Sequence, residues 1–157
     1  MVLLRSYIMI GFDICRLLSY QNTVYENLIG LFQINELPEK IGCHKFAIIN
    51  DSHQWAVIHK TLFNQIEVFD SLGTNSSISE KVKNNLNCAR NFAFNSTQLQ
   101  SDNSSLCGEF AIFYIVNRFY DDDIEFSEFL NQHFSSNHKR NEKRVVKFIK
   151  KLKYGRL

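Results

Sequence analysis

The pattern of hydrophobic and polar positions predicts a group of β-strands in the first half of the chain. Residues 45–50 and 55–59 are short apolar runs rich in β-branched side chains, and residues 66–69 alternate before a turn-like Asp-Ser-Leu-Gly. The last two of these runs are expected to form a hairpin through residues 61–64. Residues 91–94 are a further short strand candidate. We therefore predict consecutive strands of one sheet.

Helical spacing is clearest outside this group of strands. Before the Leu37-Pro38 break, apolar residues at helical spacing are Ile14, Leu17, Leu18, Tyr25, Leu28 and Ile29. Residues 79–86 fit an exposed helix. Cys107–Tyr120 is apolar on nearly every side, which indicates a helix buried by the sheet and ended by three aspartates, because carboxylates oppose the negative end of a helix dipole. With a final helix from about Asn141, the pattern predicts the α+β class.

Composition limits the class of protein further. The 157 residues and 18.4 kDa fit a single domain spanning 1–157. A hydrophobic content of 45% argues against a disordered chain, and the longest uncharged stretch, residues 91–101, is too short to span a membrane. Residues 1–12 contain Arg5 and no small-residue cleavage site, so we expect no signal peptide. Cys15, Cys43 and Cys88 read as packing residues or exposed thiols, without the CxxC spacing of a zinc ribbon, which fits an intracellular, reducing compartment.

Positive charge is concentrated at the C-terminus. Residues 139–157 hold nine of the 18 basic residues and a single acid, Glu142, so the rest of the chain is acidic. The spacing of Val145, Phe148, Ile149 and Leu152 predicts a basic amphipathic helix at about 139–153. A packed helix with solvated lysines is one interpretation, and nonspecific electrostatic contact with DNA is a second. A helix lying on a membrane surface is the third and weakest.

Three residues suggest nucleophilic chemistry when they are taken together. Cys107 opens the apolar helix, where unpaired N–H groups favour a thiolate, and Gly108 leaves room for a substrate carbonyl. His53 lies near Trp55, and Asp70 ends the following strand, so a histidine could deprotonate the thiol while a carboxylate orients it. Taken singly, each has a structural explanation: a surface histidine, a turn-forming aspartate and a buried cysteine.

The segments HQWAVIH, IEVFDSLG and STQLQSDNSSLCGEF resemble the cysteine peptidases of the adenovirus endopeptidase group. Relatives of that group include ubiquitin-like-protein-specific proteases and proteases of Maverick/Polinton-type elements. The family pattern is His next to Trp, an acid some 17 positions later, a Gln, and then Cys-Gly opening a central helix. Here His53 and Asp70 are 17 positions apart, and Gln100 lies seven before Cys107. The resemblance covers roughly residues 30–152 and implies a papain-like fold in the broad sense, with a mixed sheet packed on the central helix.

The resemblance assigns a role to each matching residue. Cys107 would be the nucleophile, His53 the base and Asp70 the group that orients it. Gln100, with the Cys107 backbone N–H, would form an oxyanion hole worth about 3–4 kcal/mol. Trp55 would pack beside the histidine. Cys88 lies in the region where the adenovirus member holds an activating peptide, although its register does not match.

The resemblance implies a thiol-dependent endopeptidase that processes structural precursors of a virus or mobile element. A ubiquitin-like-protein isopeptidase and a catalytically inactive binding module of the same fold are the alternatives. Expected partners are precursor or capsid proteins, with DNA at the basic helix and no membrane. Neither a metal nor a required cofactor is expected, while activation by DNA or a peptide stays open. The expected location is the host cytoplasm or nucleus, or the virion.

One departure from the family pattern concerns the base. The family has His immediately before Trp, whereas Gln54 occupies that place here and His53 is one residue earlier. Along a regular strand, one step turns a side chain to the opposite face. Either a bulge or a loop end at residues 52–54 brings His53 within roughly 4 Å of the Cys107 sulfur, or Gln54 has replaced the base. The spacing to Asp70 favours the first of these options.

Overall fold

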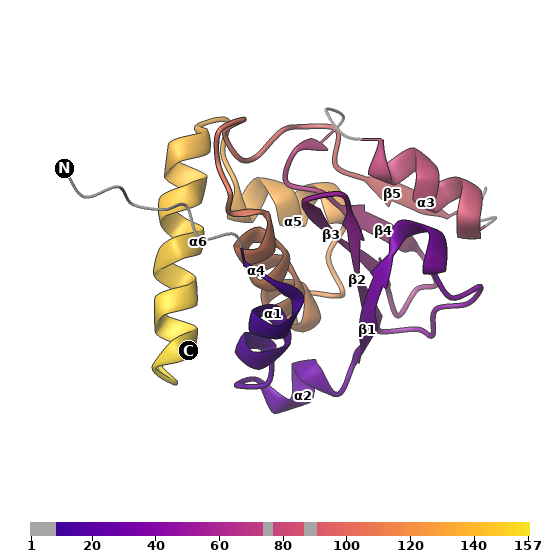
Figure 1. Ribbon diagram of the computed structural model, residues 1–157, viewed down its shortest axis with the longest axis horizontal. Helices are drawn as coiled ribbons and strands as arrows, with labels where there is room; N and C mark the ends of the chain where they lie inside the picture. The colour runs from indigo at the N-terminus through magenta and orange to yellow at the C-terminus, as the bar shows by residue number, and fades with distance from the viewer. Residues whose placement is uncertain (1–8, 74–76, 87–90) are drawn as a thin grey trace.

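A computed structural model describes residues 9–73, 77–86 and 91–157 (Figure 1). A mixed sheet and flanking helices make it an α+β fold, as the sequence predicts. Its elements, in chain order, are α1 (Gly11–Leu18), α2 (Asn22–Tyr25), β1 (Leu28–Gln33), a 3-10 turn (Ile34–Glu36), β2 (Lys45–Asp51), β3 (Gln54–Lys60), β4 (Ile66–Phe69), α3 (Ile78–Leu86), β5 (Phe92–Phe94), α4 (Cys107–Tyr120), α5 (Phe126–His133) and α6 (His138–Lys153).

The strands lie in the order β1-β2-β3-β4-β5. The central pairs β2–β3 and β3–β4 are antiparallel, while the edge strands β1 and β5 each run parallel to their neighbour. Alternate side chains of β3 therefore face opposite layers. Val57 packs into the core that contains α1, α4 and α6, while Ala56 and Ile58 pack into a smaller core with α3. Figure 1 shows α3 and α4 on opposite sides of the sheet.

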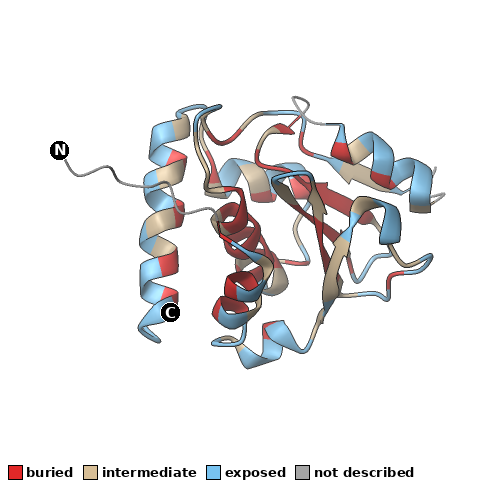
Figure 2. Ribbon diagram, viewed as in Figure 1, coloured by how far each residue is buried: buried red, intermediate tan, exposed pale blue. Residues whose placement is uncertain are grey.

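Helix α4 forms the centre of the larger core. Ten of its 14 residues are buried, and Figure 2 shows it red along most of its length. Each fully buried Phe, Ile or Val contributes about 1.5–3 kcal/mol through removal from water, so the helix is held by its whole circumference. None of the described helices has both the length and the apolar character needed to cross a bilayer.

A buried ion pair fixes the rotation of α4 against the sheet. Arg118 donates from Nη2 to Glu67 Oε1 at 2.6 Å and from Nε to Glu67 Oε2 at 2.9 Å. Tyr114, one turn earlier, donates its hydroxyl to Glu67 Oε2 at 2.8 Å. All three side chains are almost fully buried. Removing one partner would leave the other charge buried and uncompensated, which typically costs about 3–5 kcal/mol.

Most elements match the sequence-based expectations, and two do not. The expected strands correspond to β2, β3, β4 and β5, and the buried, exposed and final helices correspond to α4, α3 and α6. The expectation that Leu28 and Ile29 are helical is wrong, because β1 begins at Leu28 and pairs in parallel with β2. Pairing with a distant strand overrides the local spacing here. Helix α5 was not predicted.

The turn after β4 brings two loops into close contact, which makes Gly73 a test of this packing. Gly73 has φ +60°, and a Cβ there would lie 2.7 Å from the Thr97 carbonyl carbon. We expect Gly73→Ala to lower the free energy of unfolding by about 2–4 kcal/mol, from left-handed strain of about 1–2 kcal/mol and a similar cost of displacing the neighbouring loop. Chemical denaturation measures the loss.

Gly155 supplies the control, because it has φ +61° but no atom of the described residues within 4 Å of the added Cβ. Gly155→Ala should therefore cost no more than the left-handed strain of about 1–2 kcal/mol. Equal losses for the two variants would contradict the close approach of the turn to residues 96–97.

Candidate functional site

Cys107 lies at the first position of α4 and is 5% exposed. Its Sγ donates to the main-chain oxygen of His53 at 3.6 Å. Burial raises the pKa of the Cys107 thiol above its ordinary value, and the backbone N–H groups of Trp55 and Gly108 offset only part of this effect. The thiol is therefore neutral at pH 7. The helix N-terminus alone does not produce the thiolate that the sequence suggested.

The β2–β3 hairpin decides which side chain faces Asp70. The two strands pair without a register shift up to Asp51 and Gln54, joined by a two-residue turn in which Ser52 has φ +61°. Of the two backbone features expected at 52–54, the structure has the loop end and not the bulge. Gln54 Nε2 donates to Asp70 Oδ1 at 2.8 Å. The structure thus gives Gln54 the contact that the sequence assigned to His53.

His53 forms the second residue of this turn, and its side chain is exposed. Among the described residues, its imidazole makes no hydrogen bond or ion pair, and its contribution to the site is the main-chain oxygen beside Sγ. The expected contact between Asp70 and His53 is therefore replaced by the Asp70–Gln54 contact. The structure brings Cys107 next to the His53 backbone and leaves the imidazole outside the polar network.

Gln100 is held within the loop that precedes α4. It is 1% exposed, its Oε1 accepts from Ser71 Oγ at 2.6 Å, and its Nε2 donates to Ser104 O at 3.1 Å. Ser71 also lies 3.4 Å from Gln54 Nε2, so it connects the two glutamines. Both ends of the Gln100 carboxamide thus have protein partners, and its role in an oxyanion hole stays a prediction.

Asp70 is anchored by its own turn and by a neighbouring loop. Its Oδ1 accepts from Leu72 N at 2.9 Å, and its backbone exchanges hydrogen bonds with the Asn95 side chain at 2.9 and 2.6 Å. Sequence reasoning missed Asn95 and Ser71, because asparagine and serine in a loop are ordinary turn formers. Only the folded chain shows that they position Asp70 and Gln100.

Helix α6 holds the same loop from the opposite side. Asn141 is buried and donates to Leu99 O at 3.0 Å, and Glu142 Oε1 accepts from Ser101 N at 2.8 Å. These two bonds flank Gln100 along the chain. The C-terminal helix therefore supports the loop that leads into Cys107.

The residues predicted to line a binding surface, Trp55 and Gly108, contact the chain's own N-terminal segment. Trp55 Nε1 donates to Met9 O at 3.0 Å. A Cβ on Gly108 would meet Met9 Cβ at 3.1 Å and Sδ at 3.2 Å, so the Met9 side chain lies directly over this glycine. Ile10, which follows, has the extended angles φ −93° and ψ 162°. Met9 thus lies over the first turn of α4, against the residue that follows Cys107.

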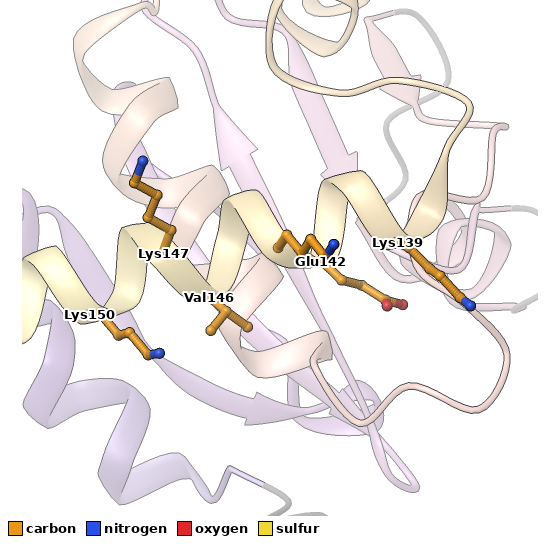
Figure 3. A pocket seen from close by; sticks show the side chains of 6 residues that line it. Lys139, Glu142, Val146, Lys147 and Lys150 are labelled. Atoms are coloured by element: carbon orange, nitrogen blue, oxygen red, sulfur yellow. The ribbon is translucent and has the colours of Figure 1, made fainter.

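The outward face of α6 is basic, as the sequence predicts. Val145, Ile149 and Leu152 are buried, whereas the lysines of the helix are exposed. Figure 3 shows Lys139, Lys147 and Lys150 extending from the helix around a shallow hollow that Glu142 also lines.

Of the remaining cysteines, Cys43 is exposed, Cys15 is half-buried, and Cys88 lies outside the described residues. Near the C-terminal end of α4, three residues of the described part of the chain bring metal-ligating atoms together: His44, His59 and Asp122.

Comparison with known proteins gives little support for any family. No family model matches the sequence, and no curated protein matches it. Among solved structures, the chain is similar to the central domain of the uncharacterized Lpg1148 protein from Legionella pneumophila. The identity is 11% and the TM-score 0.45, over 80% of this chain and 89% of that one.

The burial of Cys107 predicts slow alkylation. At pH 7, iodoacetamide should modify Cys107 more slowly than the exposed Cys43, by about tenfold or more, since the thiolate is the reactive form and burial also limits access. The rate at Cys107 should rise with pH, because a raised pKa is approached only in alkaline solution. Peptide mapping after timed quenching measures both rates. Faster labelling of Cys107 than of Cys43 at pH 7 would show an activated thiol.

Proposed function

We propose that this chain is a polypeptide-binding module with the site layout of a cysteine peptidase, and that it does not hydrolyse what it binds. The observation that carries the proposal is the hydrogen bond from Gln54 to Asp70. A catalytically inactive binding module is one of the functions that the sequence left open, and we favour it over an endopeptidase and an isopeptidase.

The chemistry of a carboxamide supports the absence of hydrolysis. A general base must accept a proton from the thiol near neutral pH, which imidazole does and an amide nitrogen does not. Gln54 contacts Asp70 through its amide nitrogen, which is a donor and cannot accept the proton. Cys107 is also buried and neutral, so neither partner supplies a thiolate. His53 would have to leave its exposed position on the turn before it could act on Sγ.

The Met9 contacts support binding of an extended segment. Trp55 donates from its indole to a main-chain oxygen, which recognises the backbone of any residue. Gly108 offers a flat surface on which an unbranched apolar side chain such as methionine packs. A segment from another protein would meet the same donor and the same surface, in competition with Met9.

Restoring a base is the sharpest test of this function. We expect the parent chain to leave denatured casein intact, and Gln54→His to gain hydrolysis by about 100-fold or more, since a positioned general base contributes about 10²–10⁴. Asp70 would then orient the new imidazole from its present position. Mass spectrometry of the products detects cleavage at whichever peptide bonds the variant prefers.

The matched controls separate binding from chemistry. Cys107→Ser placed in the Gln54→His background should abolish the gained cleavage. Binding is followed by the fluorescence of Trp55, the one tryptophan of the chain. The ligand is a peptide with the sequence of residues 5–14, and it is added to the Met9→Ala variant. Cleavage by the parent chain that is lost in His53→Ala would contradict the proposal and establish the endopeptidase instead.

A second candidate function, binding of a polyanion, rests on the exposed face of α6. Eight exposed basic residues are spaced along it while its apolar residues pack inward. These are Lys139, Arg140, Lys143, Arg144, Lys147, Lys150, Lys151 and Lys153. Exposed lysines on one face form the electrostatic footprint of a nonspecific phosphate contact.

Charge replacement on α6 tests this second function. In the α6 variant, glutamine replaces four lysines of the helix: Lys143, Lys147, Lys150 and Lys151. In the matched control, glutamine replaces four lysines outside the helix: Lys40, Lys60, Lys81 and Lys83. The α6 variant should lose affinity for a labelled DNA duplex. The slope of log K against log salt concentration should become shallower by about 0.9 for each lost phosphate contact. Fluorescence anisotropy at low and physiological salt measures both. Equal behaviour of the two variants would leave α6 a structural helix.

A further inference from the structure

A cluster of two histidines and an aspartate lies at the end of α4 opposite Cys107. His44 precedes β2, His59 lies on β3, and Asp122 follows α4. One ligand atom from each residue lies within 4.8 Å of the other two. His59 is fully buried and Asp122 is 5% exposed, while the His44 side chain is 24% exposed. Three segments that are distant in sequence thus converge on one point.

His59 lies between two carboxylates. Its Nδ1 lies 3.4 Å from Glu67 Oε2, and its Nε2 lies 3.3 Å from Asp122 Oδ1. Neither His59 Nε2 nor Asp122 Oδ1 has a hydrogen-bond partner in the described part of the chain, and both atoms are buried. A cation bound between these two atoms would satisfy both of them.

Glu67 lies behind His59 and is held in place by helix α4. Arg118 binds both carboxylate oxygens, and Tyr114 donates to one of them. A carboxylate behind a histidine is the usual outer partner of a metal-ligating imidazole.

His44 completes the cluster from the solvent side. Its Nδ1 lies 2.9 Å from Asp122 Oδ2, and the same oxygen accepts from Leu62 N at 3.0 Å, which orients the carboxylate. Asp122 also lines a surface hollow together with Thr61 and Glu125.

We propose that His44 Nδ1, His59 Nε2 and the Asp122 carboxylate bind one divalent transition-metal ion of the Zn²⁺ class. Two imidazole nitrogens and one carboxylate form a donor set typical of zinc, with water in the fourth position. Ligand bonds of about 2.0–2.1 Å place neighbouring donors of a tetrahedral ion about 3.3 Å apart, which matches the separation of His59 Nε2 and Asp122 Oδ1. The site lies about 20 Å along α4 from Cys107, at 1.5 Å per residue, and is independent of the function proposed for that end.

Cobalt titration of the full chain tests the site. After treatment with a chelator, the protein should bind one equivalent of Co²⁺, with visible d–d absorption of a tetrahedral ion and without the thiolate charge-transfer band that cysteine ligands would give. Zn²⁺ should displace the Co²⁺ and raise the melting temperature. His44→Gln, at a partly exposed position, should weaken Zn²⁺ binding by about 100-fold, since even outer partners are worth about 10–100-fold.

The control is His133→Gln, which disrupts a different histidine–aspartate pair, with Asp121 at 3.3 Å, that lies outside the cluster. It should bind Zn²⁺ as the parent does. Asp122→Asn keeps the shape of the side chain and should weaken binding as strongly as His44→Gln. A folded parent chain that binds no Co²⁺ would overturn the proposal. Binding that is equal in all variants, or that shows thiolate bands, would overturn it as well.

Discussion

Burial of α4 against the sheet is the constraint on which the rest of the structure depends. The helix is apolar around most of its circumference, so it needs neighbours on every side. The sheet covers one side, and α1, α5 and α6 supply residues for the others. The Arg118–Glu67 pair then fixes its rotation. A helix held in this way presents its two ends at fixed positions, and both ends have groups capable of chemistry.

The two ends differ in how their polar groups are satisfied. At the N-terminal end, Gln54 donates to Asp70 and Ser71 donates to Gln100, while Cys107 remains a buried thiol. Linked hydrogen bonds of this kind stabilise one another. At the C-terminal end, two buried atoms face each other without a hydrogen-bond partner among the described residues. The first arrangement fits recognition, and the second fits an ion.

The sequence predicted elements whose signal is local. Helix α4 could be bounded at both ends because a long apolar run meets three aspartates, and β4 could be bounded because its alternation meets a turn. Strand β1 could not, because its parallel pairing with β2 depends on residues about 17 positions away. The spacing of apolar residues within residues 28–33 does not reveal that pairing.

The sequence predicted which segments meet at the start of α4, but not which residue of the β2–β3 hairpin contacts Asp70. Cys107, Asp70 and Gln100 lie in one neighbourhood as the resemblance implied. The choice between His53 and Gln54 depends on the register of the β2–β3 hairpin, which a two-residue turn sets and which spacing to Asp70 cannot reveal. The partners of Met9 were equally hidden, because contacts between residues 9, 55 and 108 arise only from the fold.

The ionisation of Cys107 tests the central claim most directly. Nuclear magnetic resonance of the chain with ¹³C-labelled cysteine, assigned by comparison with Cys107→Ser, follows the Cβ shift of this residue against pH. Because burial raises the pKa of the Cys107 thiol and Asp70 is bound by Gln54, the Cys107 resonance should keep its thiol position through neutral pH and move only in alkaline solution. A Cys107 thiolate that forms below pH 7 together with the ionisation of a histidine would contradict the account.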